Sequence, residues 1–390
     1  MLFLPFQDSV PPTVACNTPY QHRFLIMKVY IHVPFCHSKC AYCDFYSTPR
    51  NEMMEAYTDT VGKEWTSTGG NSVPDTIYIG GGTPSSLPLP LLDRLIAHIT
   101  TTLPLREFTI EANPEDITSE WAEHIACHTA IDRVSMGIQT FDDDSLRFLG
   151  RRHTGAQAVK AIETIRNAGI RNLSCDLIYG LPGQTLEGWK SNIDKLISLR
   201  PEHISAYLLS FEPKTRLGVM LRKGTVEEAT DELAERMYAY LCDATRTAGY
   251  CHYEISNFAL PGHEAIHNSS YWDGSDYIGL GPGAHSMVNG VRWSNPSSLK
   301  GYIDSQGSGF RVIEDEDAKN RFNDVLITSL RTSRGLDPDM VPEEFRKEFE
   351  QASSRLILSG KLIHTPQQRL AIPEDKWLTS NNILLDLIVV

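Results

Sequence analysis

Three cysteines with unequal spacing, Cys36, Cys40 and Cys43, are the residues of this chain whose pattern points most directly to chemistry. A C-x3-C-x2-C loop can direct three thiolates to three irons of a [4Fe-4S] cluster and leave the fourth iron open to a small molecule. Zinc sites usually close with four ligands in pairs, and no second cysteine pair follows here. Chance clustering of buried cysteines is the alternative, which the strand-like run at 29–33 before the loop disfavours.

The composition limits the kinds of partner that the chain can have. With 390 residues, 41% of them hydrophobic and 22% charged, it resembles an ordinary globular protein. No run approaches the roughly 18 to 20 apolar residues of a membrane span. A net charge of −13 argues against nucleic-acid binding, which needs a basic face. Eight cysteines are too few for a disulfide scaffold, and thiols that bind metal must stay reduced, so we expect a cytoplasmic location.

The elements that must position the cysteines follow a repeating pattern. From residue 28 to about 213, short β-branched runs alternate with amphipathic segments. The predicted strands are 29–33, 76–79, 107–112, 133–138, 172–178 and 203–209, and the predicted helices are 53–65, 89–101, 119–127, 155–168 and 186–199. Such repeats form parallel sheets with right-handed crossovers. We therefore expect an α/β fold, a partial (βα)6 barrel with its chemistry at the carboxyl ends of the strands.

The chain divides into four expected regions. Residues 1–26 are expected to form a flexible leader, because Pro11, Pro12 and Pro19 interrupt it, and Met27 is a candidate for the true start. Residues 27–215 form the partial barrel. Residues 216–318 form a helical α+β extension, and residues 319–390 form a small helical, winged-helix-like module.

Some elements of the last two regions can be predicted in more detail. Thr225 and Glu228 have the spacing of a capping box and predict a long helix at 225–248. The last region is expected to hold helices at 322–330, 342–351 and 353–359 and a hairpin of 362–364 with 369–372.

Polar residues follow the predicted strands where each one ends. Gly80, Gly81 and Gly82, followed by Thr83, lack the spacing of a dinucleotide fold and the lysine of a P-loop. One glycine would suffice for a tight turn, whereas three suit a backbone that approaches a ligand and offers it N–H groups. The turn after the second strand is therefore predicted to bind a carboxylate or phosphate.

Four further side chains belong to the same expected rim. Glu111 could bind an ammonium group or a ribose, or be a solvated surface carboxylate. Asp176 lies in an apolar strand where an unpaired charge would be costly. Gln139 could hydrogen-bond a hydroxyl or amide, and Arg151 or Arg152 could clamp a carboxylate. Each signal is weak alone, but together with the cysteines they indicate one binding site.

His267 is singled out from thirteen histidines by the residues that follow it, Asn268, Tyr271 and Trp272. One interpretation is a loop that packs two aromatic rings; the other is an imidazole ligand beside a flat aromatic cofactor. Four scattered cysteines, Cys127, Cys175, Cys242 and Cys251, are expected to be small core residues, and Cys16 lies in the leader.

These motifs resemble those of a known family. The cysteine loop, with Tyr42 between its last two cysteines, resembles the radical S-adenosylmethionine (SAM) signature, in which SAM chelates the open iron and the cluster cleaves it to a 5′-deoxyadenosyl radical. The segments around the loop, 80–84, 135–141 and 176–182 resemble the oxygen-independent coproporphyrinogen III oxidase group, over nearly the whole chain. By that resemblance the residues that contact SAM would be Tyr30, Gly81, Gly82, Thr83, Glu111, Gln139, Arg151 and Asp176.

One departure from that group alters the implied function. Its coproporphyrinogen dehydrogenases carry a fourth cysteine two residues after the third, where this chain has Phe45. The variant without it, with the stretch that starts at His267, resembles the HemW branch of haem chaperones. The resemblance then implies haem contact by His267, haem transfer to apo-proteins such as respiratory cytochromes, an electron donor for the cluster and a possible homodimer. Oxidative decarboxylation of coproporphyrinogen III is the alternative.

Overall fold

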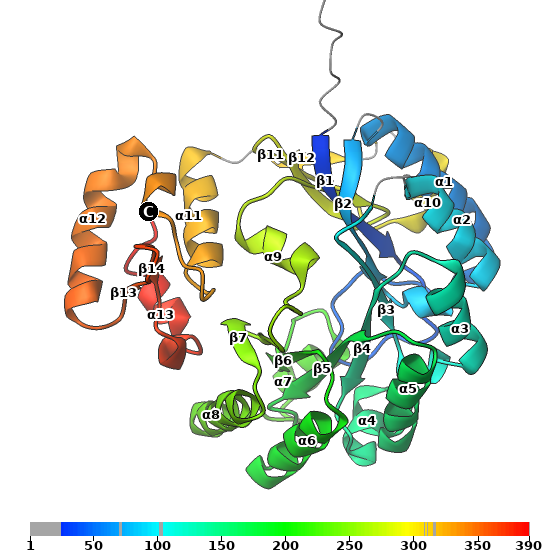
Figure 1. The fold of residues 1–390 in the computed structure, drawn as a ribbon, viewed down its shortest axis with the longest axis horizontal. Helices are drawn as coiled ribbons and strands as arrows, with labels where there is room; N and C mark the ends of the chain where they lie inside the picture. The colour runs from blue at the N-terminus through cyan, green and yellow to red at the C-terminus, as the bar shows by residue number, and fades with distance from the viewer. Residues whose placement is uncertain are drawn as a thin grey trace, which may run out of the picture.

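A curved sheet of parallel strands forms the centre of the molecule (Figure 1). The computed structural model describes residues 25–69, 72–100, 104–307, 309, 311–314 and 317–389. Six neighbouring parallel strands follow one another in chain order: β1 (Leu25–Val33), β2 (Ser72–Gly81), β3 (Glu107–Ala112), β4 (Arg133–Gln139), β5 (Asn172–Tyr179) and β6 (His203–Leu208). They form an arc, and the predicted α/β partial barrel is confirmed (Figure 1).

Helices cover the outer side of this arc. They are α1 (Met54–Thr68), α2 (Leu89–Ile99), α3 (Ser119–His128), α4 (Asp143–Leu149), α5 (Gly155–Asn167) and α6 (Leu186–Leu199). Threonine side chains at 118, 154 and 185 cap α3, α5 and α6 by accepting a backbone N–H of the first turn. The short helix α4 was not predicted from the sequence; the carboxylate of Asp142 caps it by accepting from Ser145 N.

The two faces of the sheet differ in polarity, and this difference creates the interior of the barrel. Along β4, Val134, Met136 and Ile138 are fully buried against the helices. Arg133 and Ser135 point to the other face and line a cavity. Because side chains alternate along a strand, Arg133, Ser135 and Gln139 face inward, with Gly137 between them.

β1 and β2 are longer than predicted. Their backbones pair from Leu25 with Ser72 to Val33 with Gly81, so that pairing extends beyond the apolar run of each strand. The predicted leader, residues 1–26, therefore overlaps β1 by two residues, and its remainder lies outside the described residues. No described helix has the length and apolar character needed to cross a bilayer.

The extension at 216–318 contains helices and short strands, in agreement with its predicted α+β character, and its strands join both edges of the sheet. β8 (Asn257–Ala259) and β7 (Cys251–Glu254) join β6. β9 (Tyr277–Leu280), β10 (His285–Val288), β11 (Val291–Ser294) and β12 (Val312–Glu314) continue the sheet beyond β1. Strands of three or four residues carry too little alternation for the sequence to reveal them.

The helices of the extension also differ from the prediction. They are α7 (Arg216–Arg222), α8 (Asp231–Thr247), α9 (Ile266–Trp272) and α10 (Leu299–Asp304). The predicted helix at 225–248 begins only at Asp231, because Thr230 is the residue whose side chain accepts from Leu233 N. The hydroxyl of Thr225 instead donates to Met220 O, so the predicted capping box does not form. α9 lies across the opening between the two ends of the arc (Figure 1).

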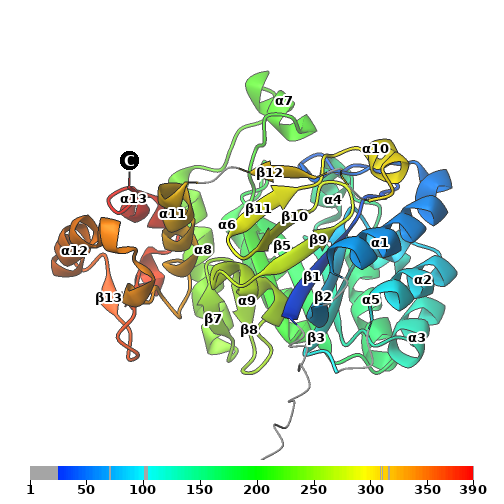
Figure 2. The same cartoon turned by 90° about the horizontal axis from the view of Figure 1, so that it is seen from above.

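The C-terminal module lies beside this opening and has a core of its own (Figures 1 and 2). It contains α11 (Ala318–Ser329), α12 (Glu343–Leu358), β13 (Ile363–His364), β14 (Leu370–Ala371) and α13 (Ser380–Leu384). The antiparallel hairpin agrees with the prediction. The two helices predicted at 342–351 and 353–359 are the single helix α12, in which Ala352 and Ser353 are buried.

One buried carboxylate ties α1 to the extension. Glu64 is 4% exposed. Its carboxylate accepts hydrogen bonds from Tyr302 OH at 2.6 Å, Gly281 N at 2.9 Å and Asn295 Nδ2 at 2.7 Å. Burial raises the pKa of Glu64 to about 7, although these three bonds favour the ionised form. This side chain thus anchors the extension to α1, in addition to the backbone pairing of β9 with β1.

Replacing Glu64 by alanine removes the carboxylate that accepts hydrogen bonds from three buried donors. Since an unsatisfied buried polar group costs about 1–3 kcal/mol, we expect the free energy of unfolding to fall by roughly 3–5 kcal/mol, measured by urea denaturation. Glu55→Ala on the same helix is the control; its side chain is 71% exposed, and the midpoint should stay at the wild-type value. Equal losses in both variants would contradict the anchoring role of Glu64.

Candidate functional site

The three cysteines lie in the loop between β1 and α1, and backbone hydrogen bonds hold this loop on several sides. Cys36 N donates to Thr48 O at 3.1 Å and closes the base of the loop. Ala41 N donates to Leu149 O at the end of α4, at 2.8 Å. Ala41 O accepts from Leu217 N of α7 at 2.9 Å. Two unpredicted helices, α4 and α7, therefore fix the position of the cysteines.

A chain of side-chain hydrogen bonds connects two of the cysteines. Thr83 Oγ1 donates to Cys36 Sγ at 3.4 Å and accepts from Asn113 Nδ2 at 3.2 Å. Asn113 Oδ1 accepts from Arg151 Nη2 at 2.6 Å, and Arg151 Nη1 reaches Cys40 Sγ at 3.6 Å. Thr83 after β2 and Arg151 after α4 thus donate to the sulfur atoms, and Asn113 after β3 links these two donors.

This donor set fits an iron–sulfur cluster. All three thiols are half-buried and line one cavity. Hydrogen bonds to cluster sulfurs are among the features that tune such centres. Burial raises the pKa of the Cys43 thiol, a shift that positively charged iron would reverse by binding the thiolate. Cys36, Cys40 and Cys43 would hold three irons, and no further protein thiol lines the described cavity.

The cavity has a volume of about 670 Å³ and brings together most of the predicted site. That size suits a small-molecule ligand. The predicted residues that line it are Cys36, Cys40, Tyr42, Cys43, Gly81, Gly82, Thr83, Glu111, Gln139, Arg151 and Asp176. Tyr30 and His267 are not among the residues of its wall.

Tyr30 lies next to the cavity, behind one of its walls. Its ring is 6.0 Å from that of Tyr78, which does line the cavity, and its hydroxyl contacts His32 Nδ1 at 3.1 Å. Burial raises the pKa of the Tyr30 hydroxyl. The SAM contact predicted for Tyr30 stays a prediction.

His267 is fully buried in α9. One ring nitrogen is 2.8 Å from Thr76 Oγ1 and the other 2.9 Å from Tyr271 OH. Burial lowers its pKa to about 3, so the ring is neutral. Its backbone N–H donates to Glu107. In this conformation the histidine fastens α9 to β2 and β3, and the haem contact predicted for it would require α9 to move.

The glycine turn has a packing role as well as a place on the cavity wall. A Cβ on Gly82 would lie 2.6 Å from Phe35 O, so only glycine lets β2 approach the cysteine loop this closely. Gly81 has φ of +119°, and its N–H donates to Glu111 Oε2. Gln139 also adopts a left-handed φ, of 68°, which is unusual outside glycine and typical of functional sites.

Two carboxyl groups on the inner face are half-buried and form no salt bridge with the described residues. Glu111 accepts from Tyr78 OH at 2.8 Å, and burial raises its pKa to about 7. Burial likewise raises the pKa of Asp176 to about 6, although serine hydroxyls, among them Ser205 and Ser135, and the charge of Arg133 favour ionisation. Both groups can change protonation state near neutral pH when a charged ligand arrives.

Sequence reasoning missed other residues of this wall. Asn113, Arg133, Ser135, Ser174 and Ser205 line the cavity, but none of them was proposed as a site residue from the sequence. The signal was the alternation of polar and apolar residues along β4, β5 and β6, which marks a polar face directed into the barrel. Of the four scattered cysteines, Cys175 and Cys242 are buried as predicted, but Cys127 and Cys251 are exposed.

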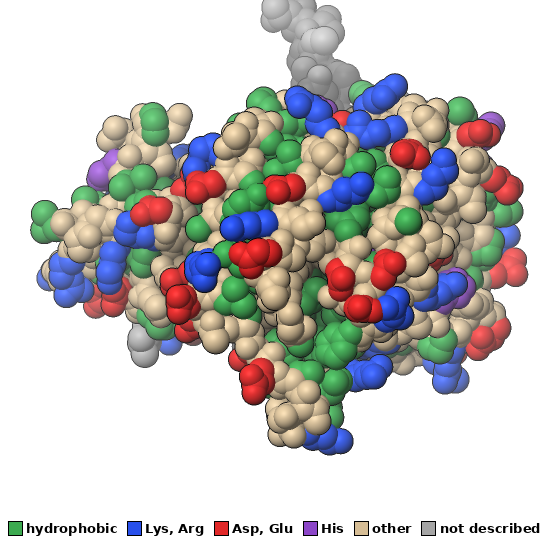
Figure 3. All heavy atoms as spheres, turned by 90° about the horizontal axis from the view of Figure 1, so that it is seen from below, with side chains coloured by type: hydrophobic (Ala, Val, Ile, Leu, Met, Phe, Trp, Pro, Cys, Tyr) green, Lys and Arg blue, Asp and Glu red, His purple; other side chains and the backbone are tan. Residues whose placement is uncertain are grey.

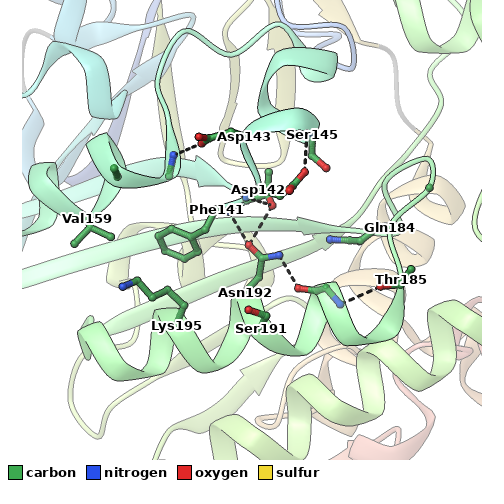
Figure 4. Close-up of a pocket in the computed structure, with 15 residues that line it drawn as sticks. Phe141, Asp142, Asp143, Ser145, Val159, Gln184, Thr185, Ser191, Asn192 and Lys195 are labelled. Atoms are coloured by element: carbon green, nitrogen blue, oxygen red, sulfur yellow. Dashed lines mark hydrogen bonds between the residues drawn. The ribbon is translucent and has the colours of Figure 1, made fainter.

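A second cavity of about 620 Å³ lies between α5 and α6, outside the barrel (Figure 4). Asn192 at its centre is bonded, accepting from Phe141 N at 2.6 Å and donating to Gly188 O at 2.8 Å. None of the predicted site residues lines it. The cavity inside the barrel is therefore the candidate site.

The chain is similar to several known proteins in sequence and in fold. A model of the radical SAM superfamily matches residues 30–196. The heme chaperone HemW of Lactococcus lactis is 34% identical over 362 residues, 91% of this chain and 95% of that protein. The heme chaperone HemW of Bacillus subtilis is 34% identical over 371 residues, 91% and 97% of the two chains. The structure of coproporphyrinogen III oxidase (HemN) from Escherichia coli shares the fold, with a TM-score of 0.78 at 20% identity and coverage of 94% and 91%.

The raised pKa of Glu111 predicts a change of stability with pH. The folded protein keeps this proton up to about pH 7, whereas the unfolded chain releases it near 4.5, so the contribution of Glu111 to stability falls as the pH rises between these values. Glutamine does not titrate. The free energy of unfolding of Glu111→Gln, relative to that of wild type, should therefore rise by up to about 3 kcal/mol as the pH increases from 4.5 to 7.5. Urea unfolding at each pH measures this difference.

The exposed Glu235 of α8 provides the matched control, since Glu235→Gln should follow the wild-type stability at every pH. A difference in the free energy of unfolding between Glu111→Gln and wild type that stays constant over this pH range would show that burial does not keep the Glu111 carboxyl protonated.

Proposed function

Because the chain belongs to the radical SAM superfamily and, within it, to the family of the heme chaperone HemW, we propose that it binds haem and delivers it to apo-proteins. The observation that carries this proposal is the 34% identity to the Lactococcus relative over 91% of this chain. The match is not confined to the barrel, so it includes the α9 segment and the C-terminal module.

The cofactors of the proposal are a [4Fe-4S] cluster and SAM. A cluster held by three cysteines offers one iron for ligand binding and supplies a low-potential electron. In our proposal Cys36, Cys40 and Cys43 hold it. The rim residues would then bind SAM: the Glu111 carboxylate can accept from an ammonium group or ribose, and Gln139 can bond a hydroxyl. The described residues leave Arg151 Nε without a partner, so it can donate to a carboxylate.

Exposed apolar side chains beside the cluster loop support a flat, apolar ligand such as haem. Phe45, Tyr207 and Leu208 line the cavity and are 67%, 44% and 43% exposed. Large exposed apolar groups gathered at one cavity usually mark a binding surface. The position that holds a cysteine in the related dehydrogenases thus offers an aromatic ring here.

The proposed partners follow from haem delivery. They are haem-accepting apo-proteins, with respiratory cytochromes as candidates, and an electron donor for the cluster; a homodimer is also proposed, and the proposed location is the cytoplasm. On the face seen in Figure 3, acidic and basic side chains are interspersed among the described residues, without a broad basic area. With the net charge of −13, this surface agrees with partners other than nucleic acid.

Haem titration followed by the Soret band tests the proposal. Wild type should bind haem, and Phe45→Ser should bind it roughly ten- to a hundredfold more weakly, because burying an aromatic ring against a ligand contributes about 1.5–3 kcal/mol. Leu385→Ser is the control: Leu385 is 70% exposed in the C-terminal module, and haem affinity should not change.

Two results would contradict the proposal. One is a wild-type protein that shows no saturable haem binding. The other is catalytic formation of protoporphyrinogen when cluster-loaded protein is incubated anaerobically with coproporphyrinogen III, SAM and a reductant. The second result would establish the alternative function, coproporphyrinogen III dehydrogenase.

A further inference from the structure

Arg133, the first residue of β4, is a buried cation at the inner end of the cavity. It is 1% exposed, yet it belongs to the cavity wall together with Ser135 and Asp176. Gln139, at the rim, lies six residues further along β4, roughly 20 Å away at the rise of a strand. The cavity thus extends from the cysteine loop far into the barrel, and Arg133 forms its floor.

The guanidinium of Arg133 has no close counter-ion. Among the described residues, no carboxylate lies within 4.0 Å of its nitrogens, and its Nε and Nη1 donate no hydrogen bond. The charge of Arg133 lowers the pKa of Glu111 and of Asp176 from a distance. Burial has the larger effect and raises both pKa values. A buried charge without a partner is strongly unfavourable, so a purely structural arginine would be paired.

The other cations of the cavity differ from Arg133. Lys39 and Arg152 are exposed to solvent. Arg151 is only half-buried, and it donates to Asn113 Oδ1 and to Gly137 O at 2.6 and 2.7 Å, so that only its Nε lacks a partner among the described residues. Arg133 therefore combines burial with free donors in a chain that is acidic overall, and an anionic ligand has to meet a local positive charge.

We propose that Arg133 forms a carboxylate subsite at the floor of this cavity, where its unpaired N–H groups receive a carboxylate of the bound ligand. The inference rests on the proposed function, because the expected source is a propionate of haem. The carboxylate of SAM, for which the rim offers Arg151, is the competing source of the same chemistry that the experiment has to distinguish. Guanidinium and carboxylate match in geometry and form strong paired hydrogen bonds when both are buried.

Paired ligands with and without the carboxylate test the subsite. Cluster-loaded wild type, Arg133→Met and Arg133→Lys are titrated with haem and with haem dimethyl ester, and with SAM and decarboxylated SAM. Wild type should prefer haem to its ester by roughly tenfold or more, and Arg133→Met should lose that preference. Arg133→Lys, which keeps the charge but not the planar fork, should retain part of it.

Arg166→Met is the matched control, because this arginine lies outside the cavity and pairs with Glu202 at 3.4 Å. It should keep the full preference for haem over the ester. Without ligand, Arg133→Met should melt at or above the wild-type temperature, since it removes an unpaired buried charge, whereas a structural role would lower the melting temperature.

The outcomes separate the inference from the proposed function. If wild type binds no haem, the proposed function is wrong. The titrations with SAM and decarboxylated SAM then test the subsite. A change in the ratio of SAM to decarboxylated SAM in Arg133→Met would then assign the carboxylate to SAM. If wild type binds haem and its ester equally and no ratio depends on position 133, the subsite is wrong. If Arg133→Met does not fold, the affinity ratios of Arg133→Lys and wild type are compared instead. A smaller ratio in Arg133→Lys supports the subsite, and equal ratios contradict it.

Discussion

The rest of the site depends on one constraint, which is that three sulfurs from a single short loop must face one cavity and leave a coordination position free. The loop has no regular structure, so other elements must hold it. Backbone bonds from α4 and α7 fix Ala41, and a hydrogen-bond chain from Thr83 through Asn113 to Arg151 reaches Cys36 and Cys40. Parallel strands in sequential order bring these residues together, because their carboxyl ends share one edge.

The same strands create a polar interior. Apolar residues face the helices, and polar ones face inward, where burial keeps Glu111 and Asp176 close to their titration points. Such an interior is unfavourable for the fold alone and is typical of a binding site. α9 covers the opening of the arc and is held there by the hydrogen bond between His267 and Thr76.

The sequence predicted the parts of the molecule that depend on local patterns. Long strands with helices, the cysteine loop and the strand-end residues Glu111, Gln139 and Asp176 follow from periodicity and spacing. The parts that depend on tertiary pairing could not be predicted. The strands β7 to β12 are short, α8 starts at a different threonine, and the burial of His267 depends on Thr76, which is 191 residues away. Arg133 was overlooked because a single arginine at the start of a strand carries no local signal.

A cluster in the three-cysteine loop, with one iron open to SAM, is the feature on which the proposed chemistry depends. Electron paramagnetic resonance of the reduced, anaerobically reconstituted protein tests it most directly. SAM should change the cluster signal of wild type and of Cys251→Ser, whose thiol is exposed and distant from the cavity wall, whereas Cys36→Ser should yield no intact [4Fe-4S] signal. A cluster signal that SAM leaves unchanged, or one that survives in Cys36→Ser, would contradict this assignment.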